Sequence, residues 1–445
     1  MDSRYHIITF GCQMNEADSD VMASLLDQAG WTAASDVSDA DLVVLNTCSV
    51  REKPEHKADS LLGALRETKE ERPELSVIVT GCMAQREGEA LVKRSRWVDA
   101  VLGTRCFHHI VDVAERVRRG ERPIVVTNLE EDPAKVRCGP LAEVRRAPLR
   151  AFIPIILGCT NFCSYCIVPQ VRGAEASRQA TEIISEVREL AARGTREVTL
   201  LGQNVLAWGR DLPTQPTFDH LLRLFDDGFG GIDGLWRVRF LTCHPRDVSR
   251  DLIERVADVP VVCEHIHLPI QAGTDKLLQE MNRGYTVDQY RAIVDQFRAG
   301  VPGISITTDM MVGFPGETDE DFGRSLNAYE STGFDAAFMF AFSPRPGTPA
   351  AERTDQVPKK VRVERLNRLI EMQNRITVER NQWEVGTIAE VLVEGPARKG
   401  PGLLEGKTRT NKHVVFAGDR TLVGTLAQVR LTEANLWGFR GEVAR

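Results

Sequence analysis

Three closely spaced cysteines constrain this chain more than any other feature of its sequence. Cys159, Cys163 and Cys166 are spaced C-x3-C-x2-C. Three thiolates can hold three irons of a four-iron cluster, so the fourth iron has no ligand within the motif and can bind an exogenous one. An iron–sulfur cluster together with S-adenosylmethionine is one recognised route into radical reactions. The spacing therefore predicts a redox cluster with an open iron.

The alternatives for these thiols are a zinc knuckle or a set of buried structural cysteines. A structural zinc site takes four Cys or His ligands. No fourth Cys or His follows at close spacing, where Pro169 and Arg172 stand instead. The spacing favours the iron–sulfur cluster over both alternatives.

The composition indicates a multidomain globular protein. Its 445 residues exceed what one hydrophobic core usually supports, so two to four domains are expected. No signal peptide opens the sequence, and no run approaches the roughly 20 apolar residues of a membrane span. We therefore expect a cytoplasmic protein, in which ten cysteines favour metal binding or catalysis over disulfides. A net charge of −7 argues against a globally basic nucleic-acid binder but allows a local basic face.

The N-terminal 120 residues alternate apolar runs with polar helical stretches, the pattern of an open parallel α/β sheet. Three of the expected strands, at 7–10, 42–45 and 77–80, are each followed by a cysteine, namely Cys12, Cys48 and Cys82. In such sheets ligands bind beyond the carboxyl ends of the strands. The three thiols are therefore expected to converge on one crevice and to hold a second cluster; the alternative is that each cysteine packs under a loop.

Residues 121–147 are rich in proline and mixed charges and read as a linker, after which a second strand and helix series runs to residue 380. Six parallel strands are expected at 153–157, 197–201, 237–241, 265–268, 304–309 and 337–342, and these suggest a partial (β/α)6 barrel. Polar and glycine-rich segments follow the strands and either contact a nucleoside cofactor or are ordinary turns. The candidate cofactor contacts are Tyr165, Gln203, Asn204, Gln271 and Gly313.

The C-terminal part of the chain carries two candidate RNA-contacting features. A helix expected over 358–380 holds seven Lys or Arg against three Glu, and is either a solvated surface helix or a basic face. Residues 381–445 change to short alternating runs broken by glycine, which fit a small antiparallel barrel of the oligonucleotide-binding shape. Either this barrel is a structural cap or its basic segment meets RNA through Arg398, Lys399, Lys407, Arg409 and Lys412.

The whole chain resembles the radical S-adenosylmethionine methylthiotransferases, in which a three-cysteine domain, a radical domain and an RNA-binding TRAM barrel occur in this order. The branch that modifies tRNA is the best match. The motifs that carry the resemblance are TFGCQMN around Cys12, NTCSVREK around Cys48, TGCMAQ around Cys82 and SPRPGTP at 343–349.

The resemblance implies transfer of a methylthio group to C2 of N6-isopentenyladenosine at tRNA position 37. It implies that Cys159, Cys163 and Cys166 hold the cluster that binds and cleaves S-adenosylmethionine. Cys12, Cys48 and Cys82 would hold an auxiliary cluster that carries sulfur, with S-adenosylmethionine serving as both methyl donor and radical source. The expected partners are the anticodon stem-loop and an electron-donor protein, and the enzyme is expected to be monomeric.

The resemblance also predicts the limits of the domains, and it leaves alternatives for the function. An auxiliary-cluster domain at 1–120 and a linker at 121–147 are expected to precede a radical core at 148–380 and a TRAM domain at 381–445. Cys243 stands where relatives usually carry serine, and Cys106, Cys138, Cys243 and Cys263 have no partner at cluster spacing, so a structural role is expected for each. The alternatives are the same reaction on threonylcarbamoyladenosine in tRNA or on ribosomal protein S12, or a non-catalytic iron–sulfur RNA-binding protein.

Overall fold

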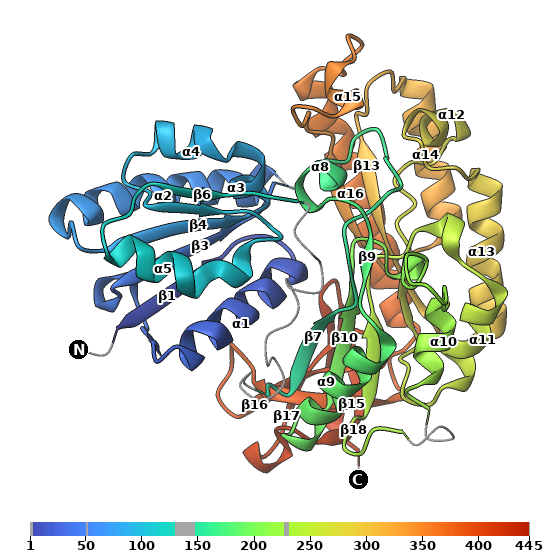
Figure 1. The fold of residues 1–445 in the computed structure, drawn as a ribbon. Coiled ribbons are helices and arrows are strands. Elements are labelled where there is room, and N and C mark those ends of the chain that lie inside the picture. The colour runs from blue at the N-terminus through green and yellow to red at the C-terminus, as the bar shows by residue number, and fades with distance from the viewer. Residues whose placement is uncertain (1–2, 50–51, 130–146, 227–230, 445) are drawn as a thin grey trace.

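The computed structural model describes residues 3–49, 52–129, 147–226 and 231–444. Figure 1 shows an N-terminal sheet domain in blue, a central domain in green to orange, and a C-terminal barrel in red beneath the central strands. Within the described ranges, no helix is both long and apolar enough to cross a membrane.

The N-terminal domain is an open sheet of six strands in the order β2-β1-β3-β4-β5-β6, and every pairing is parallel. Its central strands β3 and β4 are wholly buried, as expected for a sheet with helices on both faces. The parallel sheet predicted from the sequence is confirmed. The strands are β1 Arg4–Thr9, β2 Thr32–Ala33, β3 Leu42–Thr47, β4 Ser76–Gly81, β5 Ala100–Leu102 and β6 Ile124–Val126.

Five helices cover this sheet, and they are α1 Gln13–Gln28, α2 Glu52–Glu71, α3 Cys82–Glu87, α4 Glu89–Arg94 and α5 Ile110–Arg118. The edge strand β6 lies inside the segment that the sequence suggested as linker, so the sheet extends past residue 120. The three apolar residues of β6 form too short a run to be identified as a strand from the sequence. Cys138 lies outside the described residues.

The central domain contains the six expected parallel strands, divided into two sheets of three in the orders β11-β10-β7 and β12-β13-β14. A parallel bridge between Val238 and Val262 connects the two sheets. The prediction of a six-stranded partial barrel is confirmed. The strands are β7 Arg150–Pro154, β10 Glu197–Leu201, β11 Arg237–Phe240, β12 His265–His267, β13 Ser305–Val312 and β14 Ala336–Ala341.

Helices pack outside these strands, and several begin at the caps that their sequences encode. At Thr286 and Thr318 the side chain caps the helix and the residue three positions on reaches back, a reciprocal capping box. The helices are α8 Val168–Arg172, α9 Ala180–Ala192, α10 Phe218–Arg223, α11 Arg250–Asp258, α12 Asp275–Glu280, α13 Val287–Gly300, α14 Asp319–Thr332, α15 Pro349–Glu352 and α16 Lys359–Gln382. A short antiparallel pair, β8 Ile156–Leu157 and β9 Ala176–Ser177, flanks the cysteine loop.

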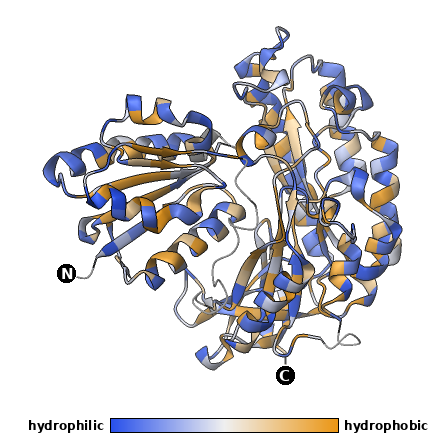
Figure 2. Ribbon diagram, in the orientation of Figure 1, coloured by the Kyte–Doolittle hydropathy of each residue, from blue (hydrophilic) through white to orange (hydrophobic). Residues whose placement is uncertain are grey.

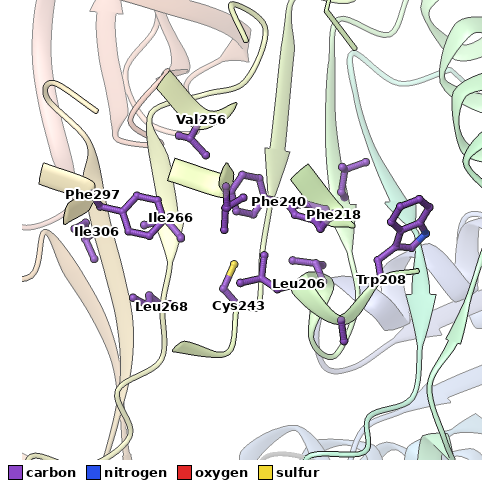
Figure 3. Packing of buried hydrophobic residues seen from close by; sticks show 14 of the residues in the cluster. Leu206, Trp208, Phe218, Phe240, Cys243, Val256, Ile266, Leu268, Phe297 and Ile306 are labelled. Atoms are coloured by element: carbon purple, nitrogen blue, oxygen red, sulfur yellow. The ribbon is translucent and has the colours of Figure 1, made fainter. Parts of the chain in front are cut away.

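Apolar residues are concentrated in the strands, as the hydropathy colouring of the ribbon in Figure 2 shows. Figure 3 shows the core of the central domain, where Cys243 lies among Leu206, Phe240 and Leu268. Cys243 is 2% exposed. Its position in the apolar core agrees with the structural role expected for it.

The C-terminal domain is a closed five-stranded barrel in the order β15-β16-β17-β19-β18. Gly406 interrupts the alternation of β16, so no local pattern marks this strand in the sequence. A Cβ atom at Gly406 would lie 2.1 Å from the carbonyl oxygen of Leu392, so close strand approach requires glycine here. The strands are β15 Ile388–Pro396, β16 Leu403–Thr408, β17 His413–Ala417, β18 Leu426–Asn435 and β19 Gly438–Val443.

Candidate active site

The three N-terminal cysteines lie at one edge of the first sheet. Cys12 precedes α1, Cys48 directly follows β3, and Cys82 begins α3 directly after β4. The first two loops are in contact, because a Cβ atom at Gly11 would lie 2.6 Å from Cβ of Cys48 and 3.1 Å from its Sγ. Strand order therefore places the thiols at the carboxyl edge of neighbouring strands, where α/β proteins bind ligands.

Gly81 fixes the approach of Cys82 to this edge. Its φ of +91° lies in the region that glycine adopts without strain. A Cβ atom here would lie 2.2 Å from the carbonyl oxygen of Thr47. Only glycine therefore lets the Cys82 loop lie directly against the Cys48 loop.

The electrostatics of Cys82 indicate which groups surround it. Burial raises the pKa of the Cys82 thiol, the Arg172 guanidinium opposes this, and the nearby Cys12 thiol raises it further. The Asn15 side chain joins the same groups, since its Oδ1 accepts from the Cys12 thiol at 3.4 Å and from Arg172 at 3.3 Å. Its amide donates to the carbonyl oxygen of Thr47 at 2.9 Å.

This donor set fits an iron–sulfur cluster. The three thiols lie at one edge of the sheet, and two buried atoms, Nη1 of Arg172 and Oγ of Ser49, have no hydrogen-bond partner within the described residues. Such orphaned groups call for a further partner. In the described part of the chain no three acidic, histidine or cysteine side chains converge on a single ion. Cluster ligands need no such convergence, because each thiolate binds a different iron.

The second cysteine loop, which carries Cys159, Cys163 and Cys166 after β8, is held by hydrogen bonds to distant segments of the central domain. The Ser164 amide donates to the carbonyl oxygen of Met281 at 3.1 Å, and its hydroxyl donates to that of Glu280 at 2.8 Å. The amide of Ala350 donates in turn to the carbonyl oxygen of Ser164 at 2.9 Å. Segments after β12 and β14 therefore fix the loop that carries Cys163.

The thiols of this loop lie in one buried environment. Burial raises the pKa of Cys166 to about 12, with the Cys163 thiol adding to the rise. Burial likewise raises the pKa of Cys159 to about 11, with Cys163 again a neighbour. Cysteines bind a metal as thiolates, so three neighbouring thiols at this spacing can each bind one iron of a cluster. The three thiols thus fit the radical cluster.

Arg283 is a site residue that the sequence patterns did not indicate. Its Nη1 donates to Sγ of Cys163 at 3.4 Å, and its Nη2 donates to the carbonyl oxygen of Pro269 at 2.9 Å. The side chain is 4% exposed. A buried arginine beside a thiol can donate a charge-assisted hydrogen bond to its sulfur. It lies 120 positions from Cys163, so no local signal pointed to it.

Two of the candidate cofactor contacts hold loops of the active face together. Gln203 Oε1 accepts from the amide of Gly158 at 2.5 Å, directly before the first cysteine of the loop. Asn204 donates to Asp247 at 2.6 Å and accepts from the amide of His244 at 3.2 Å. Direct cofactor contact by Gln203 and Asn204 stays a prediction.

The other candidates also lie at the carboxyl ends of the strands. Gln271 adopts a positive φ of 68° and bridges to Met310 of β13, whereas Tyr165 packs against the central core. At Gly313 a Cβ atom would lie 2.2 Å from the Cγ of Arg362, so this glycine makes room for α16. Cofactor contact by Tyr165, Gln271 and Gly313 stays a prediction.

Gly158 offers a test of how tightly the loop is built. A Cβ atom there would lie 2.1 Å from the carbonyl oxygen of Ala174, and φ is +75°. We expect Gly158→Ala to displace the Cys159 loop and to remove the radical cluster, about half of the bound iron. The measurement is iron content after anaerobic reconstitution. Gly63→Ala, in helix α2 with nothing within 4 Å, is the matched control and should keep all its iron; equal iron in both variants would contradict the expectation.

Two histidines of β12 form a packed pair around one hydroxyl. His265 Nε2 lies 3.1 Å and His267 Nδ1 lies 3.0 Å from Oγ1 of Thr307. Burial lowers the pKa of His265 well below its usual value, and the Arg239 charge lowers it further. The two rings are therefore packed within the domain around Thr307.

The basic residues predicted to meet RNA fall into two groups. Arg398 and Lys399 are exposed in the β15–β16 connection. Arg409 pairs with Glu264 at 2.7 Å, and Lys412 pairs with Glu384 at 2.5 Å and Asp335 at 3.2 Å. Burial lowers the pKa of Lys407, and the Arg150 charge lowers it further. RNA contact by these residues stays a prediction, although Lys407, Arg409 and Lys412 already serve the contact between the barrel and the central domain.

Several positive charges of the basic helix α16 likewise form ion pairs within the protein. Arg365 donates to Glu317 at 2.7 Å and to Asp319 at 2.8 Å, and Arg380 pairs with Asp335 at 3.0 Å. These pairs attach the helix to the central domain. The excess of positive charge along its sequence is therefore partly neutralised by acidic residues that are distant in the chain.

Three family models match successive parts of the chain. Residues 4–103 match the uncharacterized protein family UPF0004, residues 153–328 match the radical SAM superfamily, and residues 382–444 match the TRAM domain. Among solved structures, the radical S-adenosylmethionine methyltransferase TsrM from Kitasatospora setae has a TM-score of 0.58 at 16% identity, covering 91% of this chain and 81% of that one. This likeness supports the fold alone.

Curated relatives match over their full length. The tRNA-2-methylthio-N(6)-dimethylallyladenosine synthase of Carboxydothermus hydrogenoformans is 46% identical, with 99% of each chain covered. The enzyme of the same name from Moorella thermoacetica is 44% identical, with 99% of this chain and 98% of the relative covered. The radical SAM superfamily match implies a four-iron cluster and S-adenosylmethionine. This chain belongs to the family of the tRNA-2-methylthio-N(6)-dimethylallyladenosine synthases.

Proposed function

We propose that this protein transfers a methylthio group to C2 of N6-isopentenyladenosine at position 37 of tRNA, using two four-iron clusters and S-adenosylmethionine. Cys159, Cys163 and Cys166 would hold one cluster, and Cys12, Cys48 and Cys82 the other. The names of full-length relatives support the reaction. The presence of a TRAM domain supports an RNA substrate.

The observation that carries the two-cluster proposal is the packing of Cys82 against residues that directly follow the second cysteine loop. Cys82 forms a buried cluster with Ile167 and Val171. Ile167 directly follows Cys166, and Val171 belongs to α8. The five-residue helix α8 thus joins a thiol of the N-terminal sheet to the loop of the other three. A shared reaction centre needs this proximity, because sulfur from one site must reach a substrate activated at the other.

The substrate atom explains why such a centre is needed. C2 of adenine carries no acidic hydrogen, so a positioned acid or base could not activate it. When bound, the cluster of the second loop supplies one-electron cleavage of S-adenosylmethionine and a carbon radical. The chain's own residues then have to exclude water and position the thiolates, as the buried cysteines and the Ser164 clamp would do.

We further propose that RNA reaches the C-terminal barrel through its exposed side. Arg398 and Lys399 are exposed there, and Trp437 is 81% exposed in the β18–β19 turn. Cations that contact phosphates and an aromatic ring that stacks on a base are the usual elements of single-stranded RNA recognition. An electron-donor protein would supply the reductant, and the enzyme would act as a cytoplasmic monomer.

The proposed function is tested by incubating the reduced, reconstituted enzyme with S-adenosylmethionine and isopentenylated tRNA. We expect nucleoside mass analysis to find the isopentenyladenosine with one hydrogen replaced by SCH3. Unmodified tRNA lacking the isopentenyl group is the control and should stay unchanged. Formation of 5′-deoxyadenosine without the product would indicate another acceptor, such as threonylcarbamoyladenosine or ribosomal protein S12. No cleavage of S-adenosylmethionine at all would indicate a non-catalytic protein.

A further inference from the structure

Arg172 belongs to the central domain by sequence but places its side chain in the cysteine crevice of the N-terminal domain. It is the last residue of α8, six positions after Cys166, and its side chain is 4% exposed. Its Nη2 lies 2.9 Å from Oδ2 of Asp18 and 3.3 Å from Oδ1 of Asn15. The crevice of Cys12 and Cys82 is therefore built from both domains.

The guanidinium is only partly used by these contacts. Nη1 of Arg172 is buried and has no hydrogen-bond partner in the described residues. Arg172 lies close enough to Cys12 and Cys82 for their charges to interact with its own. Other buried arginines also have an unpaired N–H, but Arg172 has this group beside two thiols that the proposed function assigns to a cluster. A buried charged donor without a partner destabilises the protein, and a ligand that accepts from it would offset this cost.

The N-terminal domain fixes the backbone that carries Arg172. Thr104 Oγ1 donates to the carbonyl oxygen of Val171 at 2.5 Å, and Nε of Arg105 donates to that of Arg172 at 3.0 Å. Arg105 also donates to the carbonyl oxygens of Leu129 and Ala174. Two arginines thus connect the domains. Arg105 of the N-terminal domain donates to the backbone of α8, and Arg172 of α8 contacts Asp18 of the N-terminal domain.

We propose that Arg172 is a positioning residue that donates Nη1–H to the auxiliary cluster, or to a sulfur attached to it, and thereby sets the cluster's reduction potential. The inference rests on the proposed function, which assigns a cluster to Cys12, Cys48 and Cys82. A cluster with thiolate ligands is anionic, and its potential depends on net charge and on hydrogen bonds to sulfur. A nearby cation stabilises the reduced form, which carries one more negative charge. Asp18 moderates this effect because it partly neutralises the guanidinium.

The ion pair gives the proposal two predictions of opposite sign. Arg172→Gln removes the cation and should lower the potential of the auxiliary cluster. Asp18→Asn leaves the cation uncompensated and should raise it. We expect each substitution to change the equilibrium constant for one-electron reduction at least tenfold, which equals about 59 mV. The double variant Arg172→Gln/Asp18→Asn removes both charges and should lie between the single variants.

The experiment uses the full chain with Cys159, Cys163 and Cys166 all replaced by Ala, so that only the auxiliary cluster can form. The protein is reconstituted anaerobically and titrated with dithionite while electron paramagnetic resonance follows the reduced cluster. Iron content checks that each variant retains its cluster. Arg172→Lys, which keeps the charge but loses the planar donor, should shift the potential less than Arg172→Gln.

The outcomes separate the inference from the proposed function. Opposite shifts in the two single variants, with iron retained, support a role for Arg172 at the cluster. Unshifted potentials in both overturn it and leave Arg172 as a structural residue of the domain contact. If Arg172→Gln loses its iron, the Asp18→Asn result decides alone, and an unshifted potential there overturns the inference. If the parent binds no iron, the two-cluster function itself is wrong.

Discussion

Cys163→Ala will abolish formation of 5′-deoxyadenosine, whereas Cys82→Ala will retain it and abolish only the methylthio product. Each substitution is expected to remove one cluster, lowering the bound iron from about eight atoms to about four. The two effects differ because the loop of Cys163 would bind and cleave S-adenosylmethionine, while Cys82 belongs to the set that would carry sulfur. Iron analysis and mass detection of both products measure the effects separately.

The matched control for both variants is Cys263→Ala. Cys263 is also buried, at 1% exposed, but lies outside the two sets. It should retain all the iron and both products, with a small loss of stability. Loss of 5′-deoxyadenosine in the Cys82 variant, despite an intact radical cluster, would show that the two sites do not divide the reaction in this way.

The second large effect concerns stability and a buried acid at the amino ends of the strands. Glu197 is 1% exposed and accepts from Arg150 at 2.9 Å, with Arg239 3.0 Å away. We expect Glu197→Gln to lower the free energy of unfolding by about 3 to 5 kcal/mol, because the buried Arg239 loses its counter-charge. Urea unfolding followed by circular dichroism measures the change.

A matched pair and a pH series test the cause of this loss. Glu254→Gln removes a solvent-exposed partner of Arg250 and should cost about 0 to 1 kcal/mol. Burial raises the pKa of Glu197, but the charges of Arg239 and Arg150 outweigh it and leave the pKa lowered. The stabilisation is therefore present above the unfolded pKa and lost as pH falls through the folded one. A difference between wild type and Glu197→Gln that does not shrink in acid would contradict an ionic origin.

Local patterns in the sequence were sufficient for the strands and the cysteines. Cys48 and Cys82 follow the apolar runs that form β3 and β4. Because parallel strands end at the same edge of a sheet, these cysteines could be predicted to lie close together. Strands without such a pattern were missed, as β16 was at Gly406. Structural features that depend on a few adjacent residues could therefore be predicted from the sequence.

Contacts between residues distant in the chain could not be predicted from the sequence. The charges of Arg409 and Lys412 appeared free in the sequence, because their partners Glu264 and Asp335 lie in the central domain. Arg172 was noted only as a residue that is not a zinc ligand, although it pairs with Asp18 across the domain boundary. Nothing in one sequence indicates which of many arginines will be buried against a particular acid.

The contact between the C-terminal barrel and the central domain combines the ion pairs of Arg409 and Lys412 with hydrogen bonds to main-chain atoms of the barrel. Arg237 donates to the carbonyl oxygens of Lys407 and Glu390, and Arg239 to those of Arg409 and Thr408. Every residue type presents the same carbonyl oxygen. Side chains at the four barrel positions that supply these carbonyl oxygens can therefore be exchanged without removing the hydrogen bonds from Arg237 and Arg239.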